Sequence, residues 1–462
     1  MKTDRREFLA GSLATLGSFA ARGNAQPAPG PGTGVQLATF VADITAPMGE
    51  PLVFTSPPVR TVEHPLLAKG VVLRDAGGTY VLCALDWCEI HGETYNLFRE
   101  KIAKAAGTSP SRVAVQTLHQ HTAPAYDSNA QQMLNKLEGA PPQKGLEFLE
   151  EATTRTAAAV SKAMAEWKDV TQVGTGWASV DQVASSRRIL QPDGRILTRL
   201  SSSKNPEEQR AQEGYIDCYL RTITFFAGEQ PVARIYYYAT HPQSYYNDGR
   251  VTYDVPGIAR ERLEKESGVF QVYFTGCGGD IGMGKYNDGT PERRPVLVDR
   301  LYDGMVRSVR KVERQPLSGI EWKTVDVRFP VRSDGPFSEQ ACHQVLADPK
   351  ANPMARLNAA WALDRAARNQ PIQLSCMALG SVRVLHLPGE PFIEYQLWAQ
   401  HRRPDLFVAV AGFGDCTTGY ICTNQAYSDH GGYEQTESFV APSEEILKGA
   451  MGKLLGTPTG GA

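Results

Sequence analysis

Short apolar runs alternate with longer amphipathic stretches along most of this sequence, and this rhythm restricts the possible fold more than any other feature. Residues 70–73, 80–85 and 113–117 have the apolar character of strands, whereas 94–106 repeats apolar residues at helical spacing. Strands that alternate with amphipathic helices form sheets with helices packed on their faces. The sequence therefore predicts an α/β fold.

The same pattern continues through the rest of the chain. The runs 218–226 and 231–238 predict a pair of strands joined as a hairpin, and 270–274 and 382–387 predict two further strands. Amphipathic spacing predicts more helices at 146–167, 257–267, 295–312, 338–346, 355–369 and 443–455. Because no internal repeat or second linker is present, one large domain, or two closely packed lobes, is expected.

The N-terminal residues indicate export. Arg5 and Arg6 precede an apolar stretch of small residues at 9–21, and a small-residue cleavage site follows it. This pattern is typical of a twin-arginine signal, which we predict over residues 1–25. The apolar stretch is shorter than the roughly 20 residues that a bilayer crossing requires, so we expect no transmembrane span in the mature chain. The mature protein is predicted to be periplasmic or secreted.

Composition and charge narrow the class of protein. Residues 26–34 are rich in proline and glycine and predict a linker, so the folded domain is expected over 35–462. The 462 residues are 42% hydrophobic and 21% charged, which is typical of a globular protein. Lys and Arg total 48 against 50 Asp and Glu, so no overall field attracts nucleic acid or anionic lipid. Specificity must lie in a local site, and composition does not set the oligomeric state.

The cysteines do not form a recognisable metal or redox motif. None of the eight lies in a CxxC pair, which excludes a zinc ribbon and a thioredoxin-like site. An oxidising compartment would permit disulfides such as Cys83 with Cys88 or Cys416 with Cys422. Free buried thiols are the alternative interpretation.

Two histidines directly follow the predicted strand 113–117. His119 and His121 are two residues apart in the segment LHQHTAP, which Pro124 ends. In an extended chain, residues two apart point to the same side. Both rings can therefore face one site, one as a metal ligand and the other as an acid or base. Two buried structural histidines are the alternative.

Two more polar residues occur where predicted strands end. His241 follows the strand residues 235–239 and precedes a proline, and Glu390 stands in the segment PGEP after 382–387. Binding sites in α/β proteins gather at strand ends, so we expect these side chains to converge with the first two histidines. Glu390 could instead be a carboxylate that stabilises a helix N-terminus.

The remaining candidate segments are rich in glycine. Tyr420 and Tyr433 are flanked by glycines, which allow a ligand to approach the backbone closely, although the pattern alone favours buried structural tyrosines. The segment GCGGDIG at 276–282 superficially suggests a phosphate-binding loop. It lacks the Lys-Ser/Thr pair of a P-loop and does not match GxGxxG, so we discount phosphate binding there.

Taken in order, these segments resemble the motifs of the neutral/alkaline, non-lysosomal ceramidases, which read HTHSGP, AVHP, GD(V/I)SPN, PGE, GY-x-x-T and YE. Asp43-Ile44-Thr45 and His64-Pro65-Leu66 also look like that family. The resemblance covers nearly the whole predicted domain, although each motif is short. It implies mixed β-sheets flanked by helices, in a neutral-ceramidase-like zinc hydrolase domain without the family's C-terminal immunoglobulin-like domain.

The resemblance also implies a role for each candidate residue. One zinc ion per chain would be bound at the positions of His119, His241, Glu390 and Tyr420. His121 falls on the family's acid/base histidine, Tyr433 on a tyrosine that stabilises the reacting carbonyl, and Arg187 near the arginine of the family's NRS segment. Two imidazoles and a carboxylate leave zinc an open position, where water is acidified to a pKa of about 7. The implied reaction is hydrolysis of an amide bond in an N-acylated, ceramide-like lipid or small molecule.

One departure from the family pattern keeps other functions open. Gly282, Met283 and Gly284 stand where the family has Ser-Pro-Asn. A metal-dependent hydrolase of the same fold that acts on a secreted glycan, peptide or ester is one alternative, and a non-catalytic periplasmic binding protein is another. His121 and Tyr433 argue against the binding protein. Imidazole and carboxylate ligands also suit iron, manganese and nickel.

Overall fold

The computed structural model describes residues 34–53, 56–138, 145–244, 247–368 and 370–457. The predicted signal at 1–25, and nearly all of the predicted linker, lie outside these residues. The first strand, β1, spans Val35–Asp43.

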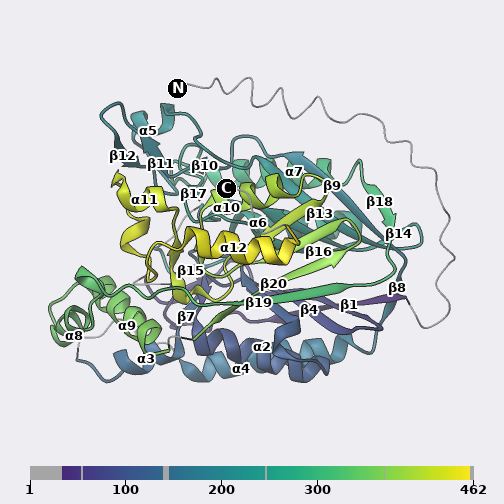
Figure 1. The fold of residues 1–462 in the computed structure, drawn as a ribbon, viewed down its shortest axis with the longest axis horizontal. Coiled ribbons are helices and arrows are strands. Elements are labelled where there is room, and N and C mark those ends of the chain that lie inside the picture. The colour runs from purple at the N-terminus through teal and green to yellow at the C-terminus, as the bar shows by residue number, and fades with distance from the viewer. Residues whose placement is uncertain (1–33, 54–55, 139–144, 245–246, 369, 458–462) are drawn as a thin grey trace. The chain divides into compact units, whose positions relative to one another are not determined.

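Three β-sheets form the framework of the described residues (Figure 1). The first has the strand order β6 (Val113–Thr117), β4 (Gly78–Leu85), β3 (Leu67–Asp75), β1 and β8 (Lys168–Val170). The second has the order β16 (Phe270–Thr275), β14 (Gln230–Tyr238), β13 (Tyr219–Ala227), β9 (Gln172–Ser179) and β18 (Glu313–Pro316). The third has the order β19 (Glu321–Val327), β20 (Ile372–Leu379), β21 (Val382–His386) and β23 (Phe407–Ala411).

All three sheets are mixed. Hairpins such as β13 with β14 pair antiparallel, while β4 with β6, β14 with β16, and β21 with β23 pair in parallel. Each parallel pair includes the strand at one edge of its sheet. The predicted α/β class with mixed sheets is confirmed.

Helices cover the sheets. Figure 1 shows α2 (Gly92–Ala106) and α4 (Leu146–Ala163) together beneath the first sheet. The second sheet packs against α6 (Asp254–Ser267) and α7 (Arg293–Ser308), and the third against α10 (Ile393–Arg402) and α12 (Glu444–Leu455). The other helices of the described residues are α3 (Ser128–Leu134), α5 (Pro206–Arg210), α8 (Glu339–Ala347), α9 (Pro353–Arg368) and α11 (Asn424–Ser428).

Strand β3 shows why the sheet sequences are continuously apolar. Val71 and Leu73 point into a core shared with the second and third sheets, whereas Val72 between them points into the core beneath α2 and α4. Successive strand residues face opposite sides, so a sheet that is buried on both faces needs apolar residues throughout. The first sheet is therefore an inner layer between helices and the other two sheets.

Short two- and three-stranded ladders connect the loops. They pair β2 (Thr61–Val62) with β15 (Arg250–Val251), β5 (Glu89–Ile90) with β7 (Ala125–Tyr126), β10 (Ser185–Ser186) with β17 (Ile281–Gly282), and β22 (Glu390–Pro391) with β24 (Tyr420–Ile421), and they join β11 (Arg188–Leu190), β12 (Arg195–Thr198) and β25 (His430–Gly431). These ladders bring together segments that are far apart in the sequence.

Most differences from the sequence expectations are small. The helix expected at 146–167 ends at Ala163, because residues 164–167 form the turn that leads into the edge strand β8 at 168–170, which pairs with β1. The helix expected at 257–267 begins earlier, at Asp254. All eight cysteines are free, so neither suggested disulfide is present and the alternative interpretation of free thiols holds.

Three edge strands from the three sheets end at the same place. The backbone N–H of Thr117, after which β6 ends, donates to the carbonyl of Phe413 at 2.9 Å. Thr275, the last residue of β16, donates its hydroxyl to the Leu118 carbonyl at 2.8 Å and accepts from the Gly412 N–H at 2.9 Å. These bonds hold the carboxyl ends of β6, β16 and β23 together, and the loops that follow them meet there.

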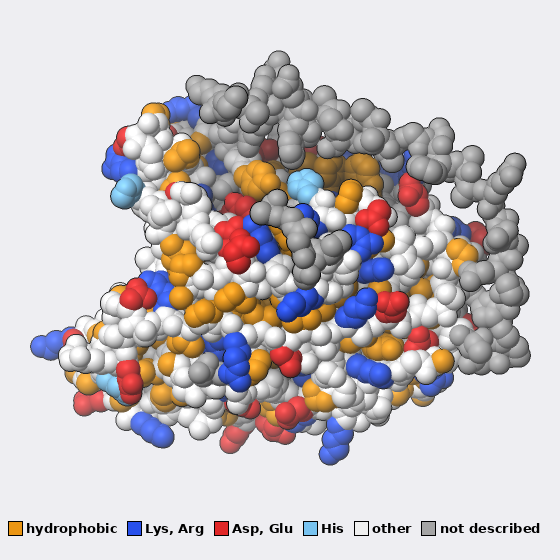
Figure 2. Space-filling model, viewed as in Figure 1, with side chains coloured by type: hydrophobic (Ala, Val, Ile, Leu, Met, Phe, Trp, Pro, Cys, Tyr) orange, Lys and Arg blue, Asp and Glu red, His pale blue; other side chains and the backbone are white. Residues whose placement is uncertain are grey.

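The surface carries charges of both signs. Figure 2 shows Lys and Arg side chains interspersed with Asp and Glu across the face that is viewed. In the part of the chain that the structure describes, none of the helices has both the length and the apolarity that crossing a membrane requires.

Candidate active site

The structure brings all seven sequence-predicted site residues together. Six of them line one cavity of about 270 Å³: His119, His121, Arg187, Glu390, Tyr420 and Tyr433. The seventh, His241, is fully buried and lies behind Glu390. The other described residues that line the cavity are Ser56, Leu200, Ser201, Gln243, Asn247, Met354 and Glu437.

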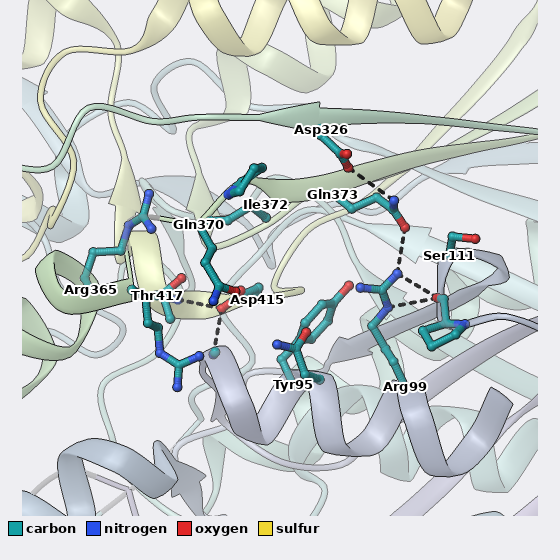
Figure 3. A pocket seen from close by; sticks show the side chains of 15 residues that line it. Tyr95, Arg99, Ser111, Asp326, Arg365, Gln370, Ile372, Gln373, Asp415 and Thr417 are labelled. Atoms are coloured by element: carbon teal, nitrogen blue, oxygen red, sulfur yellow. Dashed lines mark hydrogen bonds between the residues drawn. The ribbon is translucent and has the colours of Figure 1, made fainter. Parts of the chain in front are cut away.

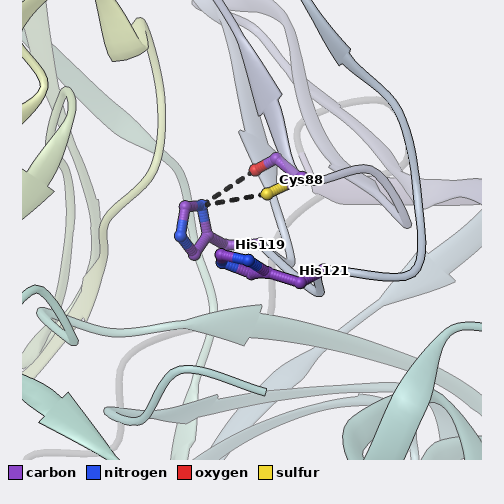
Figure 4. Close-up of side chains that lie close together, drawn as sticks. All are labelled: Cys88, His119 and His121. Atoms are coloured by element: carbon purple, nitrogen blue, oxygen red, sulfur yellow. Dashed lines mark hydrogen bonds between the residues drawn. The ribbon is translucent and has the colours of Figure 1, made fainter. Parts of the chain in front are cut away.

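His119 is held in an unusual backbone conformation. Its φ is +66°, a left-handed value that is uncommon for residues other than glycine and is typical of functional sites. The ring stacks on Phe413, with the ring centroids 4.4 Å apart. Its Nδ1 lies 3.0 Å from the Cys88 carbonyl (Figure 4). Because a carbonyl only accepts, Nδ1 carries the proton and Nε2 keeps its lone pair.

His241 is fixed in the same tautomer by a different segment. Its Nδ1 lies 2.6 Å from the Gly278 carbonyl and 3.0 Å from the Ile281 carbonyl. Both carbonyls belong to the GCGGDIG segment that follows β16. This segment, which superficially suggested a phosphate loop, thus orients an imidazole through its carbonyl groups. The Nε2 of His241 therefore keeps its lone pair, which accepts from Arg187 Nη1 at 3.2 Å.

The two Nε2 atoms converge on one carboxylate oxygen. Oε2 of Glu390 lies 3.0 Å from His241 Nε2 and 3.4 Å from His119 Nε2. Ligands in a tetrahedral zinc site, at 2.0 to 2.1 Å from the metal, lie about 3.3 Å from one another. Each ligand atom is within 4.8 Å of the other two. The donor types and their spacing therefore fit zinc or a similar divalent metal.

Tyr420 reaches this cluster through strand pairing. In the parallel ladder of β22 with β24, Glu390 is the register partner of Tyr420. The Tyr420 hydroxyl lies 3.1 Å from the Tyr433 hydroxyl, and Arg187 Nη1 donates to it at 3.2 Å. Tyr420 thus stands beside Glu390 in the cavity lining.

Arg187 links His241 to the tyrosines of the cavity, because its Nη1 donates to His241 Nε2 at 3.2 Å. This buried guanidinium donates to the hydroxyls of Tyr420 and Tyr433, and its Nη2 donates to Ser201 Oγ at 2.7 Å and to Gln243 Oε1 at 3.3 Å. Because the Tyr433 oxygen accepts from Arg187, its own proton can be donated into the cavity.

Gly282, where the resembled family has a serine, lies directly behind this arginine. A Cβ at position 282 would stand 3.1 Å from Arg187 Nε and 3.3 Å from Ser201 Oγ. These approaches are tighter than ordinary van der Waals contact. The missing side chain therefore leaves room for the guanidinium and for the Ser201 hydroxyl that bonds to it.

Burial keeps the histidines neutral. It lowers the pKa of His119 to about 3, although Glu89 opposes the shift, and with the help of Arg187 it lowers the pKa of His121 to about 3. Burial also lowers the pKa of His241. Neutral imidazoles can bind a metal or accept a proton. Burial and the nearby Glu89 raise the pKa of Glu390, an effect that a bound cation would oppose.

Known proteins resemble this chain in structure and not in sequence. No protein-family model matches the sequence, and no curated protein matches it. A neutral ceramidase from Pseudomonas aeruginosa matches the structure with a TM-score of 0.65 and 14% identity, over 93% of this chain and 76% of that chain. A ceramidase complexed with C2 matches with a TM-score of 0.64 and 14% identity, over 93% of this chain and 77% of that chain.

The chain has the neutral-ceramidase fold. This confirms the fold that the order of short motifs predicted, in a chain of highly divergent sequence. The roles given to individual residues remain predictions.

Sequence reasoning missed several residues around the site of this neutral-ceramidase fold. Phe413 stacks on His119, Ser201 bonds to Arg187, and Glu437 lines the cavity. Burial raises the pKa of Glu437 to about 7. Glu89 is also buried beside His119. Phe413 stands between two glycines after an apolar strand, a signal that could have marked it; the others have no comparable signal.

A second cavity contains none of the predicted residues. This space of about 320 Å³ lies between α2 and the third sheet, and its lining residues include Arg99, Asp326, Gln373 and Asp415 (Figure 3). Gln373 Nε2 donates to Asp326, and its Oε1 accepts from Arg99 Nη2. Asp415 accepts backbone N–H groups of Gly92 and Thr417. These polar groups hold one another, so the chemistry is better sought in the first cavity.

Proposed function

We propose that this protein is a metal-dependent hydrolase that cleaves the amide bond of an N-acylated substrate, with zinc as its metal. The observation that carries the proposal is the convergence of two fixed Nε2 lone pairs on Oε2 of Glu390. His119, His241 and Glu390 would hold the metal, with Tyr420 as the neighbouring fourth group. A divalent metal held there supplies Lewis-acid chemistry, because it polarises a carbonyl oxygen and acidifies water.

His121 supplies the proton-transfer group in this proposal. Its ring lies beside that of His119, with centroids 5.1 Å apart, and it faces the same cavity. As a neutral imidazole it accepts a proton from the attacking water and returns it to the leaving amine. An amine leaves poorly without that proton, so the step matters most for amides.

Arg187 and Tyr433 stabilise negative charge. Hydrolysis of an amide passes through a tetrahedral state whose former carbonyl oxygen is an oxyanion. The Tyr433 hydroxyl donates towards that oxygen, and the adjacent guanidinium makes the hydroxyl a stronger donor. Both groups are held in place before substrate binds, which is what electrostatic stabilisation requires.

The substrate class is supported by likeness of fold. The two matching structures are ceramidases, and this points to a ceramide-like N-acyl lipid as the first substrate to test. The cavity of about 270 Å³ is slightly below the usual range for small-molecule sites, about 300 to 1,000 Å³. It would hold the amide group and its nearest substituents.

The test combines metal analysis with a substrate panel. Metal content is measured by elemental analysis for the wild type, for the double variant His119→Ala with His241→Ala, and for the control His386→Ala. His386 is a buried histidine that bonds to Ser375 outside the cavity. Each protein is assayed on an N-acyl sphingosine, an N-acyl amino acid, a peptide, a glycan and an ester.

About one zinc per chain in the wild type and the control, lost in the double variant together with amide cleavage, is the expected result. If the wild type holds metal but cleaves only the ester, the peptide or the glycan, the proposed substrate class is wrong and that substrate takes its place. Absence of stoichiometric metal from all three proteins would refute the proposal.

We also propose export by the twin-arginine route, on the evidence of Arg5 and Arg6 before an apolar stretch. Cell fractionation compares the wild type with a double variant Arg5→Lys, Arg6→Lys. The wild type is expected outside the cytoplasm and the variant inside. Equal export of both would contradict the proposal.

A further inference from the structure

A buried acid beside the candidate ligands has no role in the proposal above. Glu89, in the short strand β5, is 3% exposed. Its Oε1 lies 3.7 Å from Nδ1 of His119, whereas Oε2 of Glu390 lies 3.4 Å from Nε2 of the same ring. Its Oε2 lies 2.9 Å from Nε2 of His91, which is 2% exposed. Three side chains thus form a line from a candidate ligand into the protein.

The fold holds this line rigidly. β5 pairs in parallel with β7, and the His91 N–H donates to the Tyr126 carbonyl at 2.9 Å. The His91 ring stacks on Trp361 of α9, with centroids 4.8 Å apart and an interplanar angle of 16°. Glu89 also interacts electrostatically with Glu390, and its charge raises the pKa of that group. The carboxyl group of Glu89 therefore lies against one candidate ligand and acts on a second.

Charge balance indicates what such a carboxylate would do. Arg187 Nη1 lies 3.2 Å from His241 Nε2, so a divalent cation at the ligands would share a buried site with a guanidinium. Among the ligands, only Glu390 supplies a full negative charge. Burying positive charge without compensation is costly, and a second carboxylate in contact with the ligands reduces that cost.

Metal-binding histidines commonly have such partners. A carboxylate or carbonyl at the second ring nitrogen fixes the tautomer and the ring orientation, and makes the first nitrogen a better donor. His119 Nδ1 donates to the Cys88 carbonyl at 3.0 Å, and the Glu89 carboxylate lies 3.7 Å from the same nitrogen, close enough to act on the ring through its charge.

We propose that Glu89 is a positioning residue of the metal site, which orients His119 and Glu390 and offsets the charge of the metal, with His91 acting through Glu89. This inference rests on the metal site proposed above. It goes beyond that site because neither residue is among the proposed ligands or catalytic groups.

The test measures metal affinity by competition with a chromophoric chelator, independently of activity. Glu89→Gln keeps the shape and an acceptor for His91 but removes the charge. We expect it to weaken zinc binding about 10- to 100-fold. Glu89→Asp retains the charge and should restore much of the affinity. The control Glu264→Gln removes an acid that pairs with the buried Lys69 at 2.6 Å, away from the cavity, and should bind zinc as the wild type does.

A double-mutant cycle separates positioning from a structural role. If His91 acts through Glu89, the double variant Glu89→Gln, His91→Gln should bind zinc no more weakly than Glu89→Gln alone. Independent losses that add would contradict this part of the inference. Thermal melts of the metal-free proteins establish that each variant is folded.

The outcomes distinguish the two proposals. Stoichiometric zinc in the wild type with unchanged affinity in Glu89→Gln would overturn the inference and leave the proposed function standing. Absence of zinc from the wild type would overturn both. If Glu89→Gln does not fold, the cobalt-substituted His91→Gln variant provides the measurement. A shifted visible absorption band would support the inference, and a band identical to that of the wild type would overturn it.

Discussion

Replacing Tyr433 by phenylalanine removes one hydroxyl from the lining of the cavity and leaves the ring. That hydroxyl accepts from Arg187 and lies 3.1 Å from the Tyr420 hydroxyl. Arg187 keeps acceptors in Tyr420, Ser201 and Gln243, so its buried charge is not stranded. We therefore expect the free energy of unfolding to fall by only about 1 kcal/mol, the usual contribution of one hydrogen bond.

The Tyr433→Phe substitution should reduce kcat far more than it reduces stability. Loss of one preorganised donor to an oxyanion lowers kcat by about 100- to 1,000-fold, or about 3 to 4 kcal/mol of transition-state stabilisation. Because the oxyanion exists only in the transition state, KM should change little. The assay is steady-state hydrolysis of the best amide substrate from the panel, together with urea unfolding.

Tyr427→Phe is the matched control. Tyr427 is also half-buried, and its hydroxyl bonds to Ser438 Oγ at 2.8 Å and to the Val440 carbonyl at 3.0 Å, outside the cavity lining. It should lose similar stability and retain its kcat. A Tyr433→Phe enzyme that loses no more kcat than Tyr427→Phe, or that changes only KM, would refute the assignment of Tyr433 as an oxyanion donor.

Three further results are expected. Gly282→Ala should lower kcat, because the added Cβ would press on Arg187, and a kcat equal to that of the wild type would contradict this. The control Gly449→Ala lies on an exposed face of α12 with open space around it, and it should raise the free energy of unfolding by up to about 1 kcal/mol. Burial raises the pKa of Asp254 from 3.8 to about 6. The folded state thus holds that proton more tightly than the unfolded chain, so about 3 kcal/mol of stability, present below pH 3.8, is lost as pH rises through 6. Urea unfolding across this range should show a smaller dependence on pH in Asp254→Asn, and an unchanged dependence would refute the account. Added zinc at about 100 times its Kd should stabilise the wild type by about 2.7 kcal/mol in thermal melts and leave the double ligand variant unaffected.

The local pattern of apolar residues was sufficient to place a strand or helix whose residues are buried in the same way along its length. β6 spans Val113–Thr117, as apolar run length predicted, because every residue of that strand is buried. Helix ends were harder to place. The periodicity of α4 continued to Trp167, but pairing of Lys168–Val170 with β1 forms a strand next to it. Contacts with distant strands decide such boundaries, and they leave no local mark in the sequence.

In the candidate site, too, some residues could be found from local sequence, whereas others are brought there only by the packing of distant segments. His119, His241 and Glu390 could be chosen from sequence because each follows an apolar strand, and strand ends meet in α/β folds. Nothing local indicated that Glu89 lies against His119, since the two are joined only by the packing of β5 beside the end of β6. The side-chain partners of a buried polar group come from segments remote in sequence.

By itself, the sequence determined the class of fold, many of its strands and helices, and six of the residues that line the cavity, because strand and helix periodicity and the residues at strand ends are local properties. Only the tertiary structure decided which imidazole nitrogen keeps its lone pair, how close the candidate ligands stand to one another, and which acid lies beside them. Those features depend on carbonyl groups and side chains that converge from three sheets. Their distances are fixed by the packing of the whole chain.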